Sequence, residues 1–415
     1  MLLEFRVKNF RSIRDEQVLS LAASRDESLR VTHTIPTGIK SVPRVVAVAT
    51  LYGANASGKS NIVRAMQFMR SVVLESASIM KPGQRFSLQS FLMSDKGDDA
   101  AAFEVTIVLD GCRYQYGFAL TCERVIQESL YVYKAFKPQR WFERHYDGSN
   151  GLDYYEFGAG LKGPKSVWES ATRDNSLFLS MAAQLNSEPL RPLFDWFANC
   201  LIIINEQAQV SPAISLRMLQ QEGGRESICN FLSKADSSIA DITVVSRKMP
   251  LNSFHYDQNQ CKAEVRSQEI EEFLLKFLHK SESKSVWFDL KEESKGTQKM
   301  FFLAGPLQHI LQNGLTLVVD EFDAGLHTLI IRNIIRLFYS NAQNRKRAQL
   351  VFTAHDTSLL DAENLYRRDQ IWFVEKDTTQ ASILISLLSC SPRKNESIRR
   401  GYLASRYGGC PHQDV

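Results

Sequence analysis

The sequence lacks long apolar runs and shows no secretion signal. No segment approaches the roughly 18 uninterrupted apolar residues that suggest a membrane-spanning helix. The first residues, Met-Leu-Leu-Glu-Phe-Arg, mix acidic and basic side chains where a signal peptide has an apolar core. We therefore expect a cytoplasmic protein with no membrane span.

Paired cysteines are also missing. The seven cysteines are scattered, and no Cys-x-x-Cys pair occurs among them. An odd, dispersed set favours free thiols in a reducing compartment. Cys410 and His412 lie two positions apart, but no second ligand pair accompanies them, which argues against a zinc site.

Net charge is small. A formal charge of +4 over 415 residues does not by itself indicate a nucleic-acid-binding protein. Basic residues do gather near the C-terminus, and this cluster has two readings: a solvated or packed terminal helix, or a basic contact surface. The cluster comprises Arg393, Lys394, Arg399, Arg400 and Arg406, and Tyr402 lies among them.

What the chain does contain is a complete phosphate-loop motif. Residues 53–60 read Gly-Ala-Asn-Ala-Ser-Gly-Lys-Ser, between a β-branched run and an apolar-periodic helix. Backbone N–H groups of such a loop cradle phosphates. Lys59 would neutralise the β- and γ-phosphates, and Ser60 would hold Mg²⁺. The predicted nucleotide contacts of the loop are Gly53, Asn55, Ala56, Ser57, Gly58, Lys59, Ser60 and Asn61.

Further polar residues follow at ordered positions downstream. The apolar run 315–319 ends in Asp320 and Glu321, which would serve Mg²⁺ and the attacking water respectively. His355 follows the next apolar run, at 351–354. Ser294 and Gly296 open a predicted helix over 299–311, where N–H groups and a hydroxyl form an anion site.

The pattern of strands and helices predicts an α/β protein with two or three subdomains. We expect strands at 2–7 and 17–22, which join the run before the phosphate loop in an N-terminal sheet. Asp110-Gly111 predicts a hairpin between 103–109 and 113–120. Residues 165–285 read as mostly helical, including 176–185 and 270–278, with a short strand at 201–204 and a loop at 250–259. Strands at 315–319, 349–353 and 370–374 alternate with a helix at 326–338, which indicates a parallel sheet.

This ordered set resembles the ATP-binding-cassette (ABC) superfamily of P-loop ATPases. The resemblance implies a Walker A motif at 53–60, a signature at 294–298, a Walker B aspartate at Asp320 and a catalytic Glu321. It also implies a D-loop at Asp323, a switch histidine at His355, and a head-to-tail dimer that sandwiches two ATP molecules. Gln89 is the candidate for the metal-side glutamine, and Gln84 is close to it.

The pattern of strands and helices, taken with this resemblance, divides the chain into four parts. Residues 1–100 form the first part of the ATPase head with its mixed sheet, and 101–160 an antiparallel β-subdomain. Residues 161–288 form a mainly helical insertion lobe, and 289–415 complete the head. The start Asn9-Phe10-Arg11-Ser12 looks like that of the RecF, SMC and OLD-type ATPases. There, the arginine matching Arg11 lies near the nucleotide; the other reading is a surface cation.

A narrower resemblance is to single-cassette bacterial ATPases of the abortive-infection, RloA/AbiLi-like group. It is carried by 320–327, 352–356, 367–376 and 402–408, although Ser405 and Thr328 depart from the usual glycine and proline. It implies a regulatory ATPase of an anti-phage system that controls a separately encoded effector such as a nuclease. The alternatives are a RecF/SMC-type DNA-repair ATPase, with nucleic acid as partner, and an ATP-bound assembly scaffold.

Overall fold

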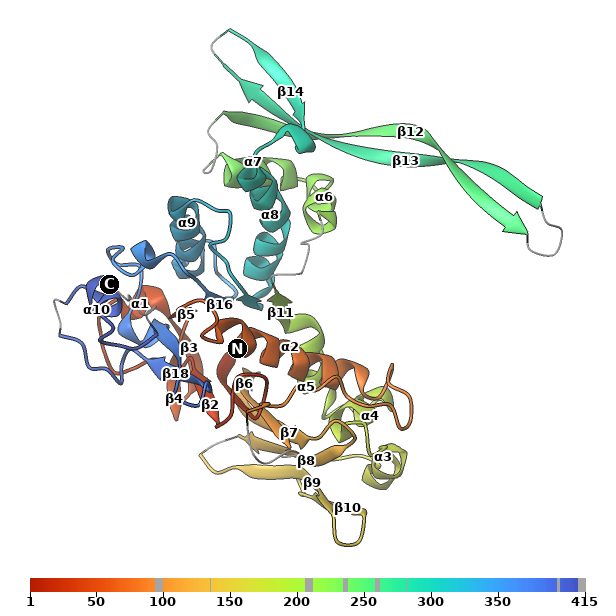
Figure 1. Ribbon diagram of the computed structural model, residues 1–415, viewed down its shortest axis with the longest axis vertical. Helices are drawn as coiled ribbons and strands as arrows, with labels where there is room; N and C mark the ends of the chain where they lie inside the picture. Colours follow the sequence, from red (N-terminus) through yellow and green to blue (C-terminus); the bar gives the residue numbers. More distant parts are fainter. Residues whose placement is uncertain are drawn as a thin grey trace. The chain divides into compact units, whose positions relative to one another are not determined.

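The computed structural model describes residues 1–93, 100–134, 136–205, 212–233, 238–257, 262–281, 283–393 and 396–409. The chain forms two compact units (Figure 1). The first comprises Met1–Ala208, Ile310–Ala324 and Ile331–Val415, and the second Gln209–His309 and Gly325–Ile330. Lys394, Cys410 and His412 lie outside the described residues, and so does the end of the loop expected at 250–259.

An antiparallel sheet forms one layer of the first unit. Its strand order is β10-β9-β8-β7-β6-β1-β2. The predicted hairpin is confirmed, since Leu109 pairs with Cys112 and both Asp110 and Gly111 have positive φ. The antiparallel block is continuous with β1 and β2, so it shares a sheet with the N-terminal strands. The strands are β1 Leu2–Lys8, β2 Gln17–Ser20, β6 Ala101–Leu109, β7 Cys112–Leu120, β8 Val125–Tyr133, β9 Gln139–Asp147 and β10 Leu152–Phe157.

A second, mainly parallel sheet carries the phosphate loop. Its order is β11-β15-β16-β5-β17-β18, and β18 is antiparallel to β17. The parallel sheet is confirmed, but the expectation that the run before the phosphate loop joins β1 and β2 is wrong. Every residue of β5 is buried, as suits a central parallel strand, whereas β1 alternates. The strands are β5 Val48–Gly53, β11 Leu201–Ile204, β15 Thr316–Val319, β16 Gln349–Thr353, β17 Ile371–Lys376 and β18 Ser382–Ser386.

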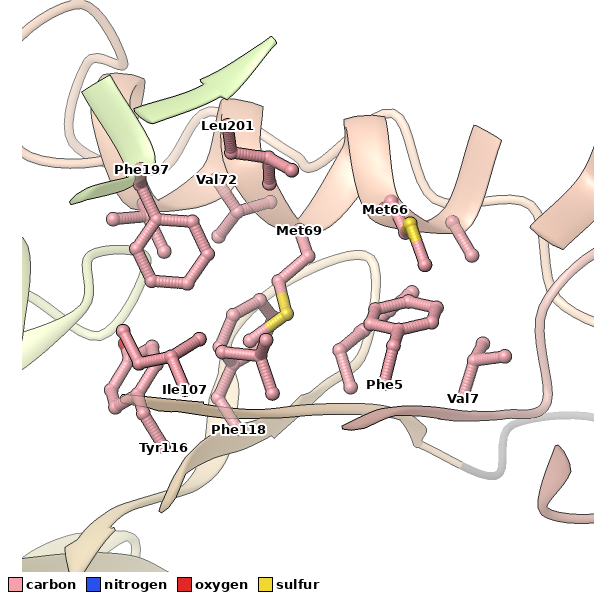
Figure 2. Packing of buried hydrophobic residues seen from close by; sticks show 14 of the residues in the cluster. Phe5, Val7, Met66, Met69, Val72, Ile107, Tyr116, Phe118, Phe197 and Leu201 are labelled. Atoms are coloured by element: carbon pink, nitrogen blue, oxygen red, sulfur yellow. The ribbon is translucent and has the colours of Figure 1, made fainter. Parts of the chain in front are cut away.

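Helix α2, Lys59–Glu75, packs on the antiparallel sheet (Figure 2). Met66, Met69 and Val72 point from the helix toward Phe5 and Phe118 of the sheet. Each such buried side chain contributes roughly 1.5–3 kcal/mol. Because α2 begins within the phosphate loop, this packing also fixes the position of the loop.

The other elements of the first unit are short, and the helix predicted at 176–185 is confirmed as α4. A small hairpin, β3 Thr34–Ile39 and β4 Val42–Val46, follows α1 Arg30–His33. Helix α9 runs from Thr328 in the second unit to Tyr339 in the first. The remaining helices are α3 Lys165–Ala171, α4 Phe178–Gln184, α5 Arg191–Asp195, η1 Trp196–Cys200, η3 Thr357–Leu359, η4 Arg368–Gln370 and α10 Ile398–Leu403.

The second unit contains a long two-stranded ribbon where helix was expected. Strands β12 Ile239–Asp257 and β13 Lys262–Lys280 pair along their length, and β14 Ser285–Asp289 pairs with the end of β13. The predicted helix at 270–278 and the mainly helical lobe are therefore wrong here. The other elements of this region are α6 Ala213–Leu219, α7 Gly224–Leu232, η2 Leu290–Glu292 and α8 Lys295–Asn313, whose last residues belong to the first unit.

The dense apolar residues of 270–278 explain the error. Their spacing fits the period of a helix as well as that of a strand, so the sequence pattern alone does not distinguish the two. Pairing with β12 determines that the segment is a strand. In the structure Leu275 and Phe277 are buried while Lys276 between them is partly exposed, which is the alternation of a strand. Pro250, expected in a loop, lies within β12 opposite Glu269. β12 is an edge strand, where proline is tolerated.

Candidate nucleotide-binding site

The phosphate loop joins the end of β5 to the start of α2. Gly58 has a φ of 105°, which only glycine adopts without strain. A Cβ atom on Gly53 would lie 2.3 Å from the carbonyl oxygen of Val374. Both glycines are therefore required by the backbone, and the loop leaves Asn55 and Ala56 exposed.

Lys59 lies inside this loop. It is 4% exposed, and its Nζ donates to the carbonyl oxygens of Gly53 at 2.8 Å and Ala54 at 2.9 Å. Burial lowers the pKa of Lys59, and the carboxylates of Asp320 and Glu321 act in the opposite direction. The ammonium group is thus held where a phosphate in the loop would replace the two carbonyls as its acceptor.

Asp320 follows β15 and meets the start of α2. Its Oδ1 accepts hydrogen bonds from Ser60 Oγ at 3.1 Å and from Thr353 Oγ1 at 2.7 Å. Its Oδ2 is buried without a hydrogen-bond partner. A hydroxyl beside a carboxylate with an unused oxygen suits Mg²⁺, which takes oxygen ligands and bound water. The residues present therefore fit the metal that the phosphate loop implies.

Glu321 and His355 lie together at the ends of neighbouring parallel strands. Glu321 Oε1 is 3.7 Å from His355 Nε2, and each side chain is more than one third exposed, at 35% and 38%. The backbone of Glu321 has a φ of 48°, held by the bond from its N–H to Thr353 Oγ1 at 2.7 Å. A strained backbone that directs a carboxylate outward is common at functional sites.

Asp323 makes contacts that its predicted role does not describe. Its Oδ2 accepts from the backbone N–H groups of His355 at 2.7 Å and Asp356 at 2.6 Å. These charge-assisted bonds fix the turn that carries the imidazole. Asp323 is thereby a positioning residue for His355, and its predicted contact with nucleotide stays a prediction.

Three hydroxyl residues at the site were missed by sequence reasoning. Ser382 Oγ donates to the carbonyl of Ser57 and lies 2.7 Å from Ser12 Oγ. Ser12 Oγ in turn accepts from Asn61 Nδ2 at 2.6 Å. Thr353, described above, is the third. Ser12 belongs to the Asn-Phe-Arg-Ser start and could have been found there, whereas nothing in the sequence marks Ser382.

Arg11 and Gln89 meet through their backbones. The N–H of Arg11 donates to the carbonyl of Gln89 at 2.7 Å, and the side chain of Gln89 is exposed. Both of their predicted roles, nucleotide contact and metal-side glutamine, remain predictions. Gln84, the other candidate, lines a cavity beside α2 together with Arg11.

Ser294 and Gly296 lie in the second unit, where the predicted helix is confirmed as α8. Ser294 Oγ accepts from the N–H of Thr297 at 3.1 Å, which is an N-cap bond. Gln298 Nε2 donates to the carbonyl of Glu293 at 2.8 Å. Ser294 itself is exposed at the start of the helix.

The C-terminal segment packs beside the phosphate loop. Tyr402 of α10 stacks on Phe373 of β17 with ring centroids 5.0 Å apart, and a Cβ on Gly409 would lie 3.5 Å from the Cα of Gly53. This is the terminal helix packing that was one reading of the basic cluster. A cleft of about 910 Å³ lies between this segment, the phosphate loop and His355.

Within the part of the chain that the structure describes, no helix is long and apolar enough to cross a membrane.

Comparison with known proteins identifies the family of the chain. A search of curated proteins finds no match to the chain. The family model described as "AAA domain, putative AbiEii toxin, Type IV TA system" matches residues 48–361, more than half of the chain, and includes the phosphate loop, Asp320, Glu321 and His355. The chain therefore belongs to this family of P-loop AAA-type ATPase domains.

Proposed function

We propose that this protein is an ATP-binding and ATP-hydrolysing regulatory ATPase of a bacterial anti-phage, abortive-infection system. The observation that carries the proposal is the convergence of Lys59, Ser60 and Asp320 at one edge of the parallel sheet, joined by the Ser60–Asp320 bond of 3.1 Å. The family description, which names a type IV toxin–antitoxin system, supports the cellular setting.

In this proposal each residue of the site has a separate role in ATP hydrolysis. Lys59 neutralises the β- and γ-phosphates, and the N–H groups of the loop hold them. Ser60 and Asp320 hold Mg²⁺, which when bound neutralises charge that develops on the phosphates. Glu321 orients a water molecule and accepts its proton. His355, fixed through Asp323, positions its imidazole beside Glu321 and the terminal phosphate.

The proposed cycle includes a dimer that sandwiches ATP. Ser294 and Gly296 of one copy close the nucleotide site of another, as the ABC resemblance implies. The exposed position of Ser294 immediately before the first residue of α8 supports this role. Formation and release of the dimer gate a separately encoded effector, such as a nuclease, in the way that phosphate-held switches gate partners.

A second candidate, a DNA-binding ATPase of the RecF/SMC type, is favoured by one observation. Arg393, Arg399, Arg400 and Arg406 are exposed near the C-terminus. Neutralisation of DNA phosphates by arginine makes affinity fall steeply with salt concentration. Salt-sensitive DNA binding would favour this candidate, and ATP binding without turnover would favour an assembly scaffold.

The first test is the mass of the purified protein with and without ATP and Mg²⁺. Wild type and Glu321→Gln are measured alone and after co-expression with a co-encoded neighbour. The proposal predicts ATP-dependent dimerisation and stable binding of the neighbour, in a dimer or a larger assembly. If the protein forms a nucleotide-dependent dimer that does not bind the neighbour but does bind DNA, the anti-phage proposal would give way to the DNA-repair function.

The dimer geometry has its own test. Ser294→Arg is expected to block ATP-dependent dimerisation while the melting temperature of the protein stays unchanged. Mixing Ser294→Arg with Lys59→Ala restores at most one complete site per dimer, built from the intact loop of the first variant and the intact signature of the second. A Ser294→Arg protein that dimerises normally would refute the sandwich.

A further inference from the structure

Strand β13 and helix α8 pack together in the second unit. Leu275 and Phe277 of β13 are buried, and the ring of Phe277 meets that of Phe301 in α8 edge to face, with centroids 5.8 Å apart. Side chains two positions apart lie on the same face of a strand, so His279 points to the same side of β13 as Leu275 and Phe277. The apolar face of β13 that packs on α8 therefore ends in a polar ring.

His279 binds the segment that leads into α8. Its Nε2 lies 2.8 Å from Oε1 of Glu293, and its Nδ1 lies 2.8 Å from Oγ of Ser238. An ionised carboxylate only accepts hydrogen bonds, so Nε2 of the neutral ring donates to Glu293 and Nδ1 accepts from the Ser238 hydroxyl. The ring also meets that of Phe288 edge to face, with centroids 5.0 Å apart. Both ring nitrogens of His279 are thus engaged, which fixes the orientation of the imidazole.

Glu293, the residue before Ser294, is held from two sides. Its side chain is 6% exposed and takes the bond from His279. Its backbone carbonyl accepts from Gln298 Nε2 of α8 at 2.8 Å. Because the peptide unit between neighbouring residues is rigid, the contacts that hold Glu293 also restrict where Ser294 can lie. The start of the signature is therefore set by β13 as well as by α8.

We propose that His279 is a positioning residue for the signature: it holds Glu293 and thereby places Ser294 for contact with the nucleotide bound by a second copy of the chain. The inference rests on the proposed function and adds a residue of the β12–β13 ribbon to it. Without the imidazole, the carboxylate of Glu293 loses its donor while it is buried, and it is better solvated when it turns outward. That movement displaces the serine that follows, so the signature closes the other site less well.

The first test measures ATP hydrolysis by phosphate release. His279→Phe keeps a ring beside Phe288 but removes both polar contacts, and we expect its rate of hydrolysis to fall about 10-fold, because small displacements of a positioning group reduce the rate. Glu293→Gln keeps an oxygen that accepts from His279 Nε2, so it should retain most of the rate. Calorimetry with a non-hydrolysable ATP analogue and Mg²⁺ checks that the phosphate loop of each variant still binds nucleotide.

Lys280→Ala is the matched control. Lys280 follows His279 in β13, is exposed and points to the opposite face of the strand, so its replacement should leave the rate unchanged. A double variant, His279→Phe with Glu293→Ala, should lose no more activity than either single change, because both changes remove the same contact.

A mixture of two disabled chains tests whether His279 acts on the site of the other copy. In this mixture Ser294→Arg supplies the phosphate loop of the hybrid site, and Lys59→Ala supplies its signature. His279→Phe added to the Lys59→Ala chain should lower the activity of the mixture about 10-fold. The same change added to the Ser294→Arg chain should have no further effect, since the signature of that chain is already disabled. A general loss of stability would act from either chain.

Several outcomes would overturn the inference. A wild-type rate of hydrolysis in His279→Phe refutes it and leaves the proposed function intact. Equal losses when His279→Phe is placed in either chain of the mixture also refute it, because they show a purely structural role. Strictly additive losses in the double variant refute the shared contact. Absence of hydrolysis in the unmodified mixture, with an active wild type, refutes the sandwich dimer of the proposed function, and the inference fails with it.

Discussion

The imidazole Nε2 of His355 lies 3.7 Å from Oε1 of Glu321, at the ends of adjacent parallel strands. A water molecule that attacks a terminal phosphate needs an acceptor for its proton. The carboxylate of Glu321 is such an acceptor, and the imidazole ring of His355 lies beside it. Both side chains are partly exposed, so solvent water can reach them.

Replacement of Glu321 by glutamine tests this pair. Glutamine keeps the shape but accepts a proton poorly, so we expect ATP hydrolysis to fall on the order of 100-fold while ATP affinity is kept. Steady-state phosphate release and calorimetric binding measure the two quantities. Glu363→Gln, a change at an exposed glutamate, is the control. An unchanged hydrolysis rate would remove Glu321 as the proton acceptor.

Lys59→Ala should weaken ATP binding on the order of 100-fold, since it removes a charge-assisted contact from inside the phosphate loop. Calorimetry with the non-hydrolysable analogue measures the dissociation constant. Lys40→Ala, which removes an exposed lysine between β3 and β4, should bind like wild type. Tight binding by Lys59→Ala would contradict the assignment of the loop.

Asp323→Ala should reduce turnover without changing nucleotide affinity. The substitution leaves the N–H groups of His355 and Asp356 without their acceptor, so the turn that carries the imidazole loosens. We expect the rate constant for hydrolysis to fall about 10-fold. Equal loss of affinity and turnover would instead indicate that Asp323 contacts the nucleotide directly.

His33 predicts a pH dependence of stability. Burial lowers the pKa of His33 from 6.5 to about 4, and its ring stacks on Tyr339. The folded state therefore disfavours the protonated ring, while the unfolded state takes up a proton below pH 6.5. Stability is unaffected by this group above pH 6.5 and falls as the pH drops toward 4.

We expect this loss to be on the order of 3 kcal/mol at pH 4, because each unit by which the pKa is lowered corresponds to about 1.4 kcal/mol. Denaturant unfolding of wild type and His33→Phe between pH 4 and 7 measures it, because both proteins share every other titrating group. The variant should lose less stability on acidification. Parallel curves for the two proteins would show that His33 contributes nothing to the acid dependence.

Local patterns in the sequence predicted the elements whose signal is local. Asp110-Gly111 specified a hairpin because both residues tolerate positive φ, and buried β-branched runs specified the parallel strands. Asp320 and Glu321 could be assigned because they follow such a run in the order that a phosphate loop requires. These predictions did not depend on distant contacts.

Contacts between distant segments were not predictable in this way. Ser382 holds the phosphate loop through a single hydroxyl, and no motif distinguishes it from any other serine in a strand. Phe277 belongs to a run that suits a helix equally well, and its pairing with β12 decided the outcome. Asp323 was assigned from its place after Glu321, whereas its contacts to His355 depend on the approach of two strands.

The bond between Ser382 and Ser57 joins residues 325 positions apart. A ribosome adds about 5–20 residues per second, so roughly 15–65 seconds pass between synthesis of the loop and synthesis of the serine that holds it. During this interval the nascent chain has the phosphate-loop motif but not the hydroxyl that fixes its geometry. The phosphate loop can therefore take its fully held geometry only after Ser382 has been synthesised.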